Sequence, residues 1–427
     1  MLEPGNGFNA PTPQPNAVGD PAAPGYDAKA IARWDVVPFQ TFDAEFNIGV
    51  VAFHINGIDR VEFSVDGGPW TPVYEMKLNP RTDVWEYTAT LDANLHDDGL
   101  IEVRAIAWPV VGEPRVVDVL YMNTDSTGQV LANREVRWVS SSGSNVTGEG
   151  TQGNPFATIK QAAMSINEAQ DGKADNGLIY LTAGHYAFSG GYNGAAWLSP
   201  RTESAWLTVS AAPGLAPEQV VIDQGGSNQR LNASRIHLRG IQLTTTLVSS
   251  SNLNHPAMIW WEGCVLTTHD RFAAEQFRNG FSVYQTDTVI RQTLSGPAGV
   301  RLSRNVLAEE IGSDPFQNVR CLINSEARDC GREGWQAAGL SVAPHPDIVQ
   351  WYFASGHHEN FIVYGLRAIE DIGETQGFLF GSDPESVSDI ALVNVLCAGN
   401  SQWAATTNHL LIWHSTFTHQ WRWRDDA

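Results

Sequence analysis

A repeated unit of two short apolar strands with a break between them constrains this sequence more than any other feature. Each unit has an alternating apolar run, a break, and a second alternating run, as in RIHLRGIQLTT (235–245), MIWWEGCVLTTHD (258–270), GVRLSRNVLAEE (299–310), NFIVYGLRAIED (360–371), DIALVNVLCAGN (389–400) and HLLIWHSTFTHQ (409–420). The breaks recur after about 21 to 29 residues or after a longer interval, at Gly240, Gly263, Arg304, Gly365, Asn394 and Ser415. Repeats of this length made of short strands predict a solenoid of stacked β-strands.

Composition agrees with an all-β chain. With 427 residues the chain exceeds the usual size of one compact core, so we expect two domains or one elongated repeat domain. Hydrophobic residues make up 42% and charged residues only 17% of the sequence, and 39 glycines supply turns. This profile suits many short strands joined by turns better than a helical bundle.

The charge excludes some classes of partner. A formal net charge of -21 argues against binding to nucleic acid or to an anionic membrane, because cations must outnumber acids locally to displace counterions from phosphate. The only lysines are Lys29, Lys77, Lys160 and Lys173, so positive charge beyond residue 173 comes from arginine. Such an acidic surface is typical of a protein that is kept soluble by its charge, or of one that works in a saline or calcium-containing extracellular medium.

The first third of the chain is predicted to hold a leader and a small sandwich. Residues 1–30 are rich in proline, glycine and alanine and are expected to be flexible. Residues 31–125 contain short alternating runs separated by turn clusters, among them FNIGVVAFHI, RVEFSVDGGPW, VWEYTATLD and GLIEVRAIAW. Several short strands at this spacing predict a β-sandwich. The stretch VEFSVDGGPWTPV followed by DDGLIEVRAIAW resembles bacterial immunoglobulin-like modules, which serve as spacers or binding accessories.

Residues 134–427 form the second predicted domain, and its start resembles a known family. VRWVSSSGSNVTGEGTQGNPFATIKQAAMSINEAQ, from Val136, indicates a strand, a loop, and a helix beginning near Asn154 and Pro155; the buried strand NGLIYLTAGHYAF follows. This arrangement is similar to the N-terminal capping segment of the pectate-lyase-like superfamily. The resemblance implies a right-handed parallel β-helix with a capping helix, which covers the apolar end of the first coil.

Localisation follows from the expected fold. No apolar stretch approaches the roughly 20 residues that span a bilayer, so no membrane insertion is expected. The N-terminus lacks the pattern of a signal peptide, and the β-helix class indicates a secreted or cell-surface protein. Cys264, Cys321, Cys330 and Cys397 are too few for a disulfide scaffold and are predicted to be buried thiols, although an oxidising compartment would allow Cys321 to pair with Cys330.

One stretch concentrates groups that could carry chemistry. HPDIVQWYFASGHHEN, residues 345 to 360, places histidines and carboxylates around an apolar run. Alignment with TQGFLFGSD of the next coil puts Ile348 and Gln350 inside, over two phenylalanines. By the period of two in a strand, His345 and Asp347 then face outward on one surface. An outward histidine beside an aspartate can act as a general base and the group that orients it.

Further residues complete the hypothetical site. His345 and Asp347 are the candidate catalytic pair, with Arg367 or Arg332 as a charge partner. The candidate substrate-binding residues are Trp351, His357, His358 and Glu359, and the candidate ligands of Ca²⁺ are Glu370 and Asp371. Two alternatives remain open: the histidines and glutamate at 357–359 form a solvated turn, or His345, His357 and His358 bind zinc.

The resemblance implies an acidic extracellular polysaccharide as the partner and two competing reactions. Polysaccharide lyases of the superfamily remove the proton beside a uronate carboxyl group, and the absence of lysine after Lys173 leaves arginine or histidine as the base. Glycoside hydrolysis instead needs two carboxyl groups about 5 to 9.5 Å apart. The rival class is a non-catalytic structural or adhesive protein of a surface layer, filament or phage appendage, which could self-assemble and would use the β-helix as a rod.

Overall fold

The computed structural model describes the chain from residue 28 to residue 423 with internal gaps. The described residues are 28–187, 202–223, 229–231, 235–244, 247–249, 257–267, 282–293, 295–331, 347–353, 356–369, 376–381, 387–398, 402–404, 407–417 and 421–423. Strands dominate these residues, which confirms the all-β prediction. The predicted leader, residues 1–30, lies almost wholly outside them.

Residues 31 to 124 form two mainly antiparallel sheets that face each other, here called the sandwich. One sheet has the order β1 (Ile31–Trp34), β3 (Glu45–Phe53), β7 (Val84–Asp92) and β6 (Lys77–Asn79). The other has the order β2 (Thr41–Phe42), β10 (Leu120–Thr124), β8 (Gly99–Pro109), β4 (Ile58–Val65) and β5 (Thr71–Val73), with β9 (Arg115–Val116) beside β8. A short 3-10 helix, η1 (Ala93–Leu95), follows β7. Alternate residues such as Val50, Val61 and Val103 are fully buried between the sheets and build one apolar core.

From residue 136 onward every strand pair is parallel, and this part is here called the parallel stack. The first sheet contains β11 (Val136–Val139), β12 (Leu178–Leu181), β14 (Leu207–Ala211), β17 (Arg235–Arg239), β20 (Met258–Glu262), β22 (Ser282–Thr286), β24 (Val300–Arg304), β27 (Cys321–Ile323), β30 (His358–Tyr364), β33 (Val387–Val393) and β36 (Asn408–Trp413). The second contains β13 (Gly184–Tyr186), β15 (Val220–Ile222), β18 (Gln242–Leu243), β21 (Val265–Thr267), β23 (Val289–Arg291), β25 (Leu307–Glu309), β28 (Glu326–Arg328), β31 (Arg367–Ile369), β34 (Leu396–Cys397) and β37 (Thr416–Phe417).

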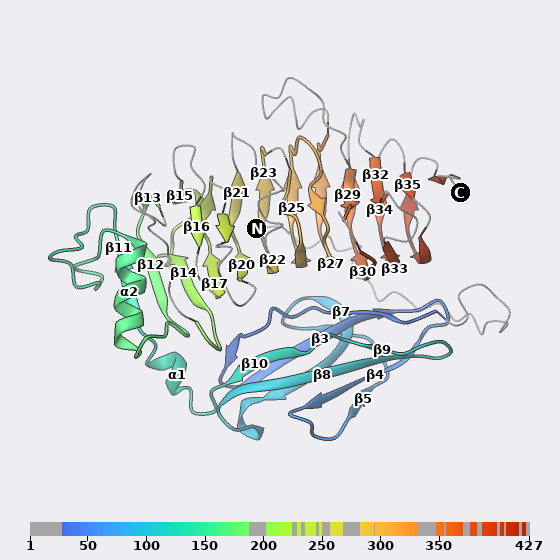
Figure 1. The fold of residues 1–427 in the computed structure, drawn as a ribbon, viewed down its shortest axis with the longest axis horizontal. Coiled ribbons are helices and arrows are strands. Elements are labelled where there is room, and N and C mark those ends of the chain that lie inside the picture. Colours follow the sequence, from blue (N-terminus) through green and yellow to red (C-terminus); the bar gives the residue numbers. More distant parts are fainter. Residues whose placement is uncertain are drawn as a thin grey trace.

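Shorter parallel sheets add to these two. The third sheet contains β26 (Phe316–Gln317), β29 (Asp347–Trp351) and β32 (Gln376–Phe380), and two-stranded sheets join β16 (Gln229–Leu231) to β19 (Leu247–Ser249) and β35 (Gln402–Ala404) to β38 (Trp421–Trp423). A second 3-10 helix, η2 (Pro217–Gln219), precedes β15. Figure 1 shows the strands side by side in chain order along the length of the stack. One strand of the first sheet with the next strand of the second is called a rung below.

The corner between the first and second sheets has the same backbone conformation in successive rungs. The corner residue has a positive φ of 46° to 74° and is Gly240, Gly263, Asp287, Asn305, Asn324, Gly365, Asn394 or His414. Its amide donates to a carbonyl of the next rung, as from Gly240 to Glu262 at 2.9 Å. Glycine and asparagine tolerate the left-handed region best, which explains the break in the sequence repeat.

Two details of the predicted repeat are wrong. The breaks assigned to Arg304 and Ser415 lie one residue away, at Asn305 and His414. The longer intervals in the repeat are filled by two more rungs, formed by β22 with β23 and by β27 with β28. Their corners carry aspartate or asparagine instead of glycine, which obscured the repeat in the sequence.

A helix closes the beginning of the parallel stack, but it begins later than predicted. The helix α2 (Ile159–Ala169) has Thr158 as its N-cap, whose Oγ1 accepts from the Gln161 amide at 3.2 Å. Asn154 is instead part of a loop, and its Nδ2 donates to the Thr147 carbonyl at 2.9 Å. The buried face of α2 joins the core of the stack, so the helix covers an end that would otherwise be apolar and exposed. A one-turn helix, α1 (Gln129–Ala132), lies between the sandwich and β11.

The sandwich packs against the outer face of the first parallel sheet (Figure 1). The apolar cluster between them unites Val51, Phe53 and Val84 of the sandwich with sheet residues that include Trp260 and Tyr364. These residues extend from Trp206, directly before β14, to Val393 in β33, so the contact extends over most of the stack. The sandwich is therefore docked along the stack and is not a detached spacer.

Polar contacts fix the docked position. Asp35 and Arg304 form an ion pair of 2.5 Å in which both side chains are buried. Asn360 receives a hydrogen bond from the Ala32 amide and donates one to the Ala32 carbonyl, both at 2.9 Å. Its side-chain amide therefore pairs with the edge of β1 as a neighbouring strand would.

All four cysteines are free and buried. The suggested pairing of Cys321 with Cys330 is not present: Cys321 faces the sandwich, whereas Cys330 lies in the core of the stack. Burial raises the pKa of Cys264 to about 12, so this thiol stays protonated.

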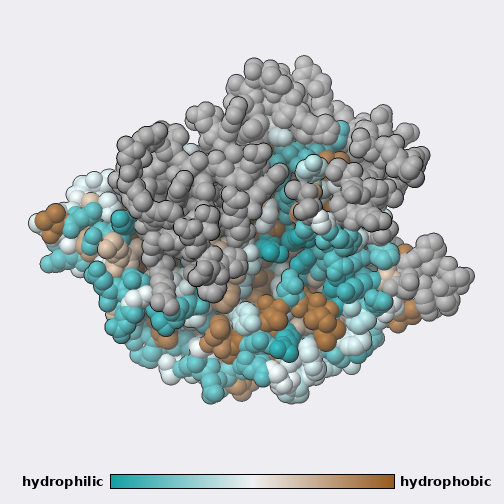
Figure 2. All heavy atoms as spheres, in the orientation of Figure 1, coloured by the Kyte–Doolittle hydropathy of each residue, from teal (hydrophilic) through white to brown (hydrophobic). Residues whose placement is uncertain are grey.

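The described surface is mostly hydrophilic, and apolar side chains gather mainly over the sandwich in the view of Figure 2. Exposed apolar residues of the sandwich include Leu100, Val110 and Val116. Within the described residues, no helix has the length and apolar character that crossing a membrane requires.

Candidate functional site

A polar groove of about 400 Å³ crosses the outer face of the second parallel sheet. It spans four strands, from β18 to β25, and lies on a different sheet from the one that the sandwich covers. Its lining residues carry amide, hydroxyl, guanidinium and carboxylate groups, and they are Gln242, Thr244, Thr267, Arg291, Gln292, Glu309 and Glu310.

Strand alternation explains why these side chains line the groove. In β23, Ile290 is buried in the core of the stack and Arg291 faces outward; in β25, Ala308 is buried and Glu309 faces outward. Pairing between strands aligns Arg291 with Glu309, and Glu309 with Arg328 of β28. The outward side chains Arg291, Glu309 and Arg328 therefore alternate in charge from rung to rung, and the attraction between opposite charges stabilises the pairing of neighbouring strands.

The rim of the groove is formed where the chain turns after the strands of the second sheet, and this turn has the same backbone conformation in successive rungs. Gln292, Glu310 and Asp329 have positive φ values of 51°, 54° and 49° at the ends of successive strands. Each of the first two amides donates to the next rung, from Gln292 to Glu309 at 3.3 Å and from Glu310 to Arg328 at 3.1 Å. This turn fixes the side chains of Gln292 and Glu310 at the rim, where Gln292 Nε2 donates to Glu310 Oε2 at 2.9 Å.

The groove retains hydrogen-bonding capacity for a ligand. Arg291 is paired with Glu218 at 3.2 Å on the rim, where both side chains are partly exposed, so the pair contributes little to stability. Within the described residues, the Glu309 carboxylate makes no hydrogen bond or ion pair. A set of carboxylate, amide, hydroxyl and guanidinium groups on one rigid face can bind a ligand rich in hydroxyl and carboxylate groups.

A second feature is a buried carboxyl pair where the chain enters the third sheet. Asp314 precedes β26 and Asp347 begins β29; their side chains are only 4% and 0% exposed. The Asp347 amide donates to Asp314 Oδ1 at 2.7 Å. Gln350 Nε2 donates to Asp347 Oδ2 at 3.1 Å, and Gln317 Nε2 donates to Asp314 Oδ2 at 2.8 Å.

Burial shifts both carboxyl groups toward the protonated form. It raises the pKa of Asp347 to about 8, helped by the nearby charge of Asp314. Burial also raises the pKa of Asp314 to about 6, although the hydrogen bonds from the Asp347 amide and from Gln317 act in the opposite direction and lower it. Asp347 is thus mostly protonated at neutral pH. The pair is enclosed by protein, so it acts on the stability of the stack and not on a ligand in the groove.

The predicted orientation of the 345 to 360 stretch is wrong for Asp347, Val349 and Gln350, whereas Ile348 is buried in the core of the stack as predicted. Asp347 and Val349 are fully buried, whereas the side chain of Gln350, expected inside, is half-buried. The true register pairs Val349 with Phe378 and Trp351 with Phe380, one residue away from the alignment made on the sequence. A shift of one residue exchanges the two faces of a strand, which is why the predicted outward surface is inside.

Trp351 cannot bind substrate, because it is fully buried in the core of the stack. Its Nε1 donates to the Val319 carbonyl at 2.8 Å, and its ring stacks on Phe380 with centroids 5.2 Å apart.

His357 directly precedes β30, which already begins at His358, and Glu359 contacts the sandwich. Glu359 Oε1 forms an ion pair of 2.6 Å with Arg115 of the sandwich. The His358 ring stacks on Phe353, and its Nδ1 lies 3.0 Å from Arg320. His357 Nε2 lies 3.0 Å from Ser388 Oγ. The structure therefore gives Glu359 a docking contact, and these residues do not form the predicted substrate site with Asp347.

Of the remaining predicted residues only Arg367 is described, and it does not lie beside Asp347. Arg367 lies in β31 of the second sheet, beside Glu326 and Leu396 of the adjoining strands, whereas Asp347 lies in the third sheet. Arg367 makes no ion pair with a described residue, and its Nε atom is buried without a partner. The other predicted residues lie outside the described residues; they are His345, Arg332, Glu370 and Asp371.

Sequence reasoning missed the groove and the carboxyl pair for different reasons. Arg291 and Glu309 occupy corresponding positions in DTVIR and NVLAE, a signal that alignment of the corner residues Asp287 and Asn305 would have revealed. Asp314 and Asp347 are separated by 33 residues, and no local pattern predicts their contact.

The described residues gather no group of three or more histidine, cysteine, aspartate or glutamate side chains that could hold a metal ion. The candidate calcium ligands Glu370 and Asp371 lie outside these residues, so calcium binding stays a prediction.

No protein-family model matches this sequence, and no curated protein is significantly similar to it. A search of solved structures returned the fibronectin(III)-like modules of Clostridium thermocellum CbhA, at 17% identity and a TM-score of 0.16. The alignment covers 23% of this chain and 47% of that chain. A TM-score this low carries no argument about fold or function.

Proposed function

We propose that the parallel stack is a right-handed parallel β-helix of the pectate-lyase-like superfamily, preceded by an immunoglobulin-like module. Three features support this proposal: the parallel sheets ordered along the chain, the repeated left-handed corner, and the capping helix α2. The sequence resemblance around Val136 points in the same direction.

We further propose that the protein is secreted or held at the cell surface and binds an acidic polysaccharide along the groove of the second sheet. The observation that carries this proposal is the polar groove itself, which crosses four strands of one flat face. A linear polymer can follow such a face, because neighbouring strands repeat the same outward positions at about 4.8 Å.

The arginines of this sheet support an acidic polymer. Arg291, Arg328 and Arg367 recur along it, although the chain as a whole is strongly acidic. A guanidinium group recognises a carboxylate by paired hydrogen bonds, so Arg291 and Arg328, which lie two strands apart on either side of Glu309, offer two sites for uronate carboxylates. If the bound polymer is also cleaved, β-elimination fits the set: Arg291 would neutralise the uronate carboxylate, and Glu309 would accept the C5 proton beside it. The C4–C5 double bond would form as the C4–O glycosidic bond breaks, and the leaving oxygen would take a proton from water.

The binding experiment uses polygalacturonate and alginate as acidic polymers and amylose as a neutral one, in affinity electrophoresis with the full chain. We expect retardation by an acidic polymer and at least a fivefold weaker effect for R291Q, whereas E309Q removes a carboxylate that repels the polymer and should not weaken retardation. The matched control is R104Q, which changes an exposed arginine of the sandwich. Equal retardation of R291Q and the wild type by every retarding polymer would refute the assignment of the groove.

Activity assays separate binding from cleavage. Absorbance near 235 nm, with and without EDTA, detects the unsaturated product of β-elimination, and a reducing-sugar assay detects hydrolysis. The rival function is structural or adhesive, with the stack as a rigid rod. Ordered assemblies of the protein, together with no retardation and no cleavage, would establish that rival.

A further inference from the structure

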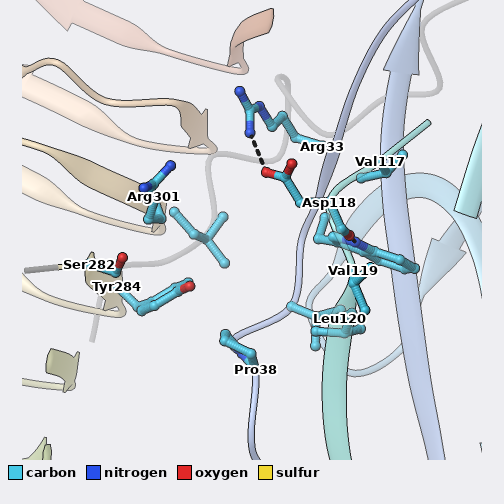
Figure 3. A pocket seen from close by; sticks show the side chains of 12 residues that line it. Arg33, Pro38, Val117, Asp118, Val119, Leu120, Ser282, Tyr284 and Arg301 are labelled. Atoms are coloured by element: carbon cyan, nitrogen blue, oxygen red, sulfur yellow. Dashed lines mark hydrogen bonds and ion pairs between the residues drawn. The ribbon is translucent and has the colours of Figure 1, made fainter. Parts of the chain in front are cut away.

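A second cleft, of about 390 Å³, lies between the sandwich and the first parallel sheet. Figure 3 shows Arg301, Ser282 and Tyr284 on the side of the parallel sheet, with Arg33 and Asp118 across the opening on the side of the sandwich. The cleft is distinct from the groove, since it lies on the first sheet and shares no lining residue with it. Its volume is at the lower end of the range of about 300 to 1,000 Å³ for small-ligand sites.

The charge of this cleft opposes the charge of the protein. Its lining contains two arginines and one carboxylate, although the chain carries a net charge of -21. Arg320 is not a lining residue but lies close enough to interact with the charges of Arg33 and Arg301, and burial, together with these charges, lowers the pKa of Arg320 to about 10. That guanidinium is still protonated at neutral pH. Three mutually repelling cations with one carboxylate, Asp118, leave a local excess of positive charge that favours an anion.

The two lining arginines differ in availability. Arg33 is engaged: it pairs with Asp118 at 3.1 Å and donates to the carbonyls of Asn360 at 2.7 Å and Glu359 at 3.2 Å. Arg301 is exposed and makes no hydrogen bond or ion pair with a described residue. It is therefore the cation of the cleft that can pair with a ligand.

The other lining groups are those that bind a sugar ring. Burial raises the pKa of Tyr284 to about 12, so its hydroxyl remains a hydrogen-bond donor. Ser282, in the same strand, contributes a second hydroxyl, and the indole of Trp34 supplies an apolar surface. Arginine with hydroxyl donors and an aromatic ring matches a small molecule that carries both an anionic group and a carbon face with hydroxyls.

We propose that the cleft between the sandwich and the first sheet binds one sugar unit bearing a carboxylate or a sulfate ester. Arg301 binds the anionic group, Ser282 and Tyr284 bind ring hydroxyls, and Trp34 packs against the ring. The proposal does not depend on the groove of the second sheet. The sandwich then has a role in recognition, because the site does not exist without it.

Ligand-observed NMR titration of the full chain tests the site with glucuronate and glucose 6-sulfate. Glucose is the neutral control of the same size, and inorganic sulfate is the control without a ring. We expect at least one of the two sugar anions to bind and glucose to bind at least about tenfold more weakly, since a hydrogen bond to a charged group is the strongest contact in the cleft. Binding of inorganic sulfate as tight as that of the sugar anions would overturn the role of the ring contacts.

Variants of the lining residues test whether the sugar anion binds in this cleft. R301Q should lower the affinity for the bound sugar anion at least about tenfold, and Y284F should lower it several-fold, while R104Q leaves it unchanged. Thermal unfolding of each variant confirms folding, which an exposed residue such as Arg301 should not alter. Unchanged affinity in R301Q, or no binding of either sugar anion, would overturn the proposal. R291Q separates this result from the groove, because it should weaken polymer retardation without changing binding of the sugar anion.

Discussion

Replacing Asp347 with asparagine should make the protein more stable at neutral pH and remove part of its pH dependence. Asp347 is fully buried beside Asp314, and its pKa is raised to about 8. Asparagine has the same shape, can still accept the hydrogen bond from Gln350, and carries no charge at any pH.

The direction follows from proton linkage. An aspartate in the unfolded chain has a pKa of about 3.9, so between about pH 4 and pH 8 the folded protein holds a proton on Asp347 that the unfolded chain has lost. Stability due to this group is therefore complete below about pH 4, falls as the pH rises, and has reached its minimum above about pH 8. The slope is about 1.4 kcal/mol per pH unit, or roughly 2.7 kcal/mol between pH 5 and pH 7.

Urea unfolding at pH 5, 6 and 7, followed by tryptophan fluorescence, measures this slope. The wild type should lose about 2.7 kcal/mol more than D347N between pH 5 and pH 7. The contribution of Asp314 is common to both proteins and largely cancels. D43N, at an exposed aspartate, is the matched control and should follow the wild type. Parallel curves for the wild type and D347N would show that Asp347 titrates normally in the folded protein and would refute the reasoning.

Three more changes test the docking of the sandwich and the core of the stack. R304A leaves Asp35 as a buried charge without its ion pair and should lower the free energy of unfolding by about 3 to 5 kcal/mol in urea titration. N360A removes two hydrogen bonds to Ala32 and should lower it by about 2 kcal/mol, and an unchanged midpoint would contradict the role of that side chain. W351A leaves a cavity in the stack and should lower the free energy of unfolding, measured by calorimetry, by about 3 to 5 kcal/mol. A much smaller loss would indicate that Trp351 is not buried.

Much of the fold was predictable because it is periodic. Alternation of apolar residues identified strands such as β3, β7 and β8 within one or two residues of their observed ends. The corner glycines Gly240, Gly263 and Gly365 indicated the repeat because their conformation favours glycine. Rungs whose corner is Asp287 or Asn324 were missed, since aspartate and asparagine are common at many other turns.

The site was less predictable because it depends on register and on long-range contacts. A shift of one residue in the alignment of β29 with β32 reversed the predicted surface of Asp347. No sequence pattern indicated that Glu359 would pair with Arg115, which is 244 residues away. The docking of the sandwich on the first sheet decides which faces can meet a ligand, and it depends on the shapes of two folded units.

Docking also changes how the stack can come apart. Repeats that contact only their neighbours can fray one at a time from an open end. Here the sandwich contacts the first sheet from Trp206, directly before β14, to Val393 in β33, so the rungs between them are all held by the same domain. Local opening of any of these rungs must disturb the same apolar interface with the sandwich. We therefore expect amide hydrogens along the first sheet to exchange as one cooperative unit rather than in a gradient toward the C-terminus.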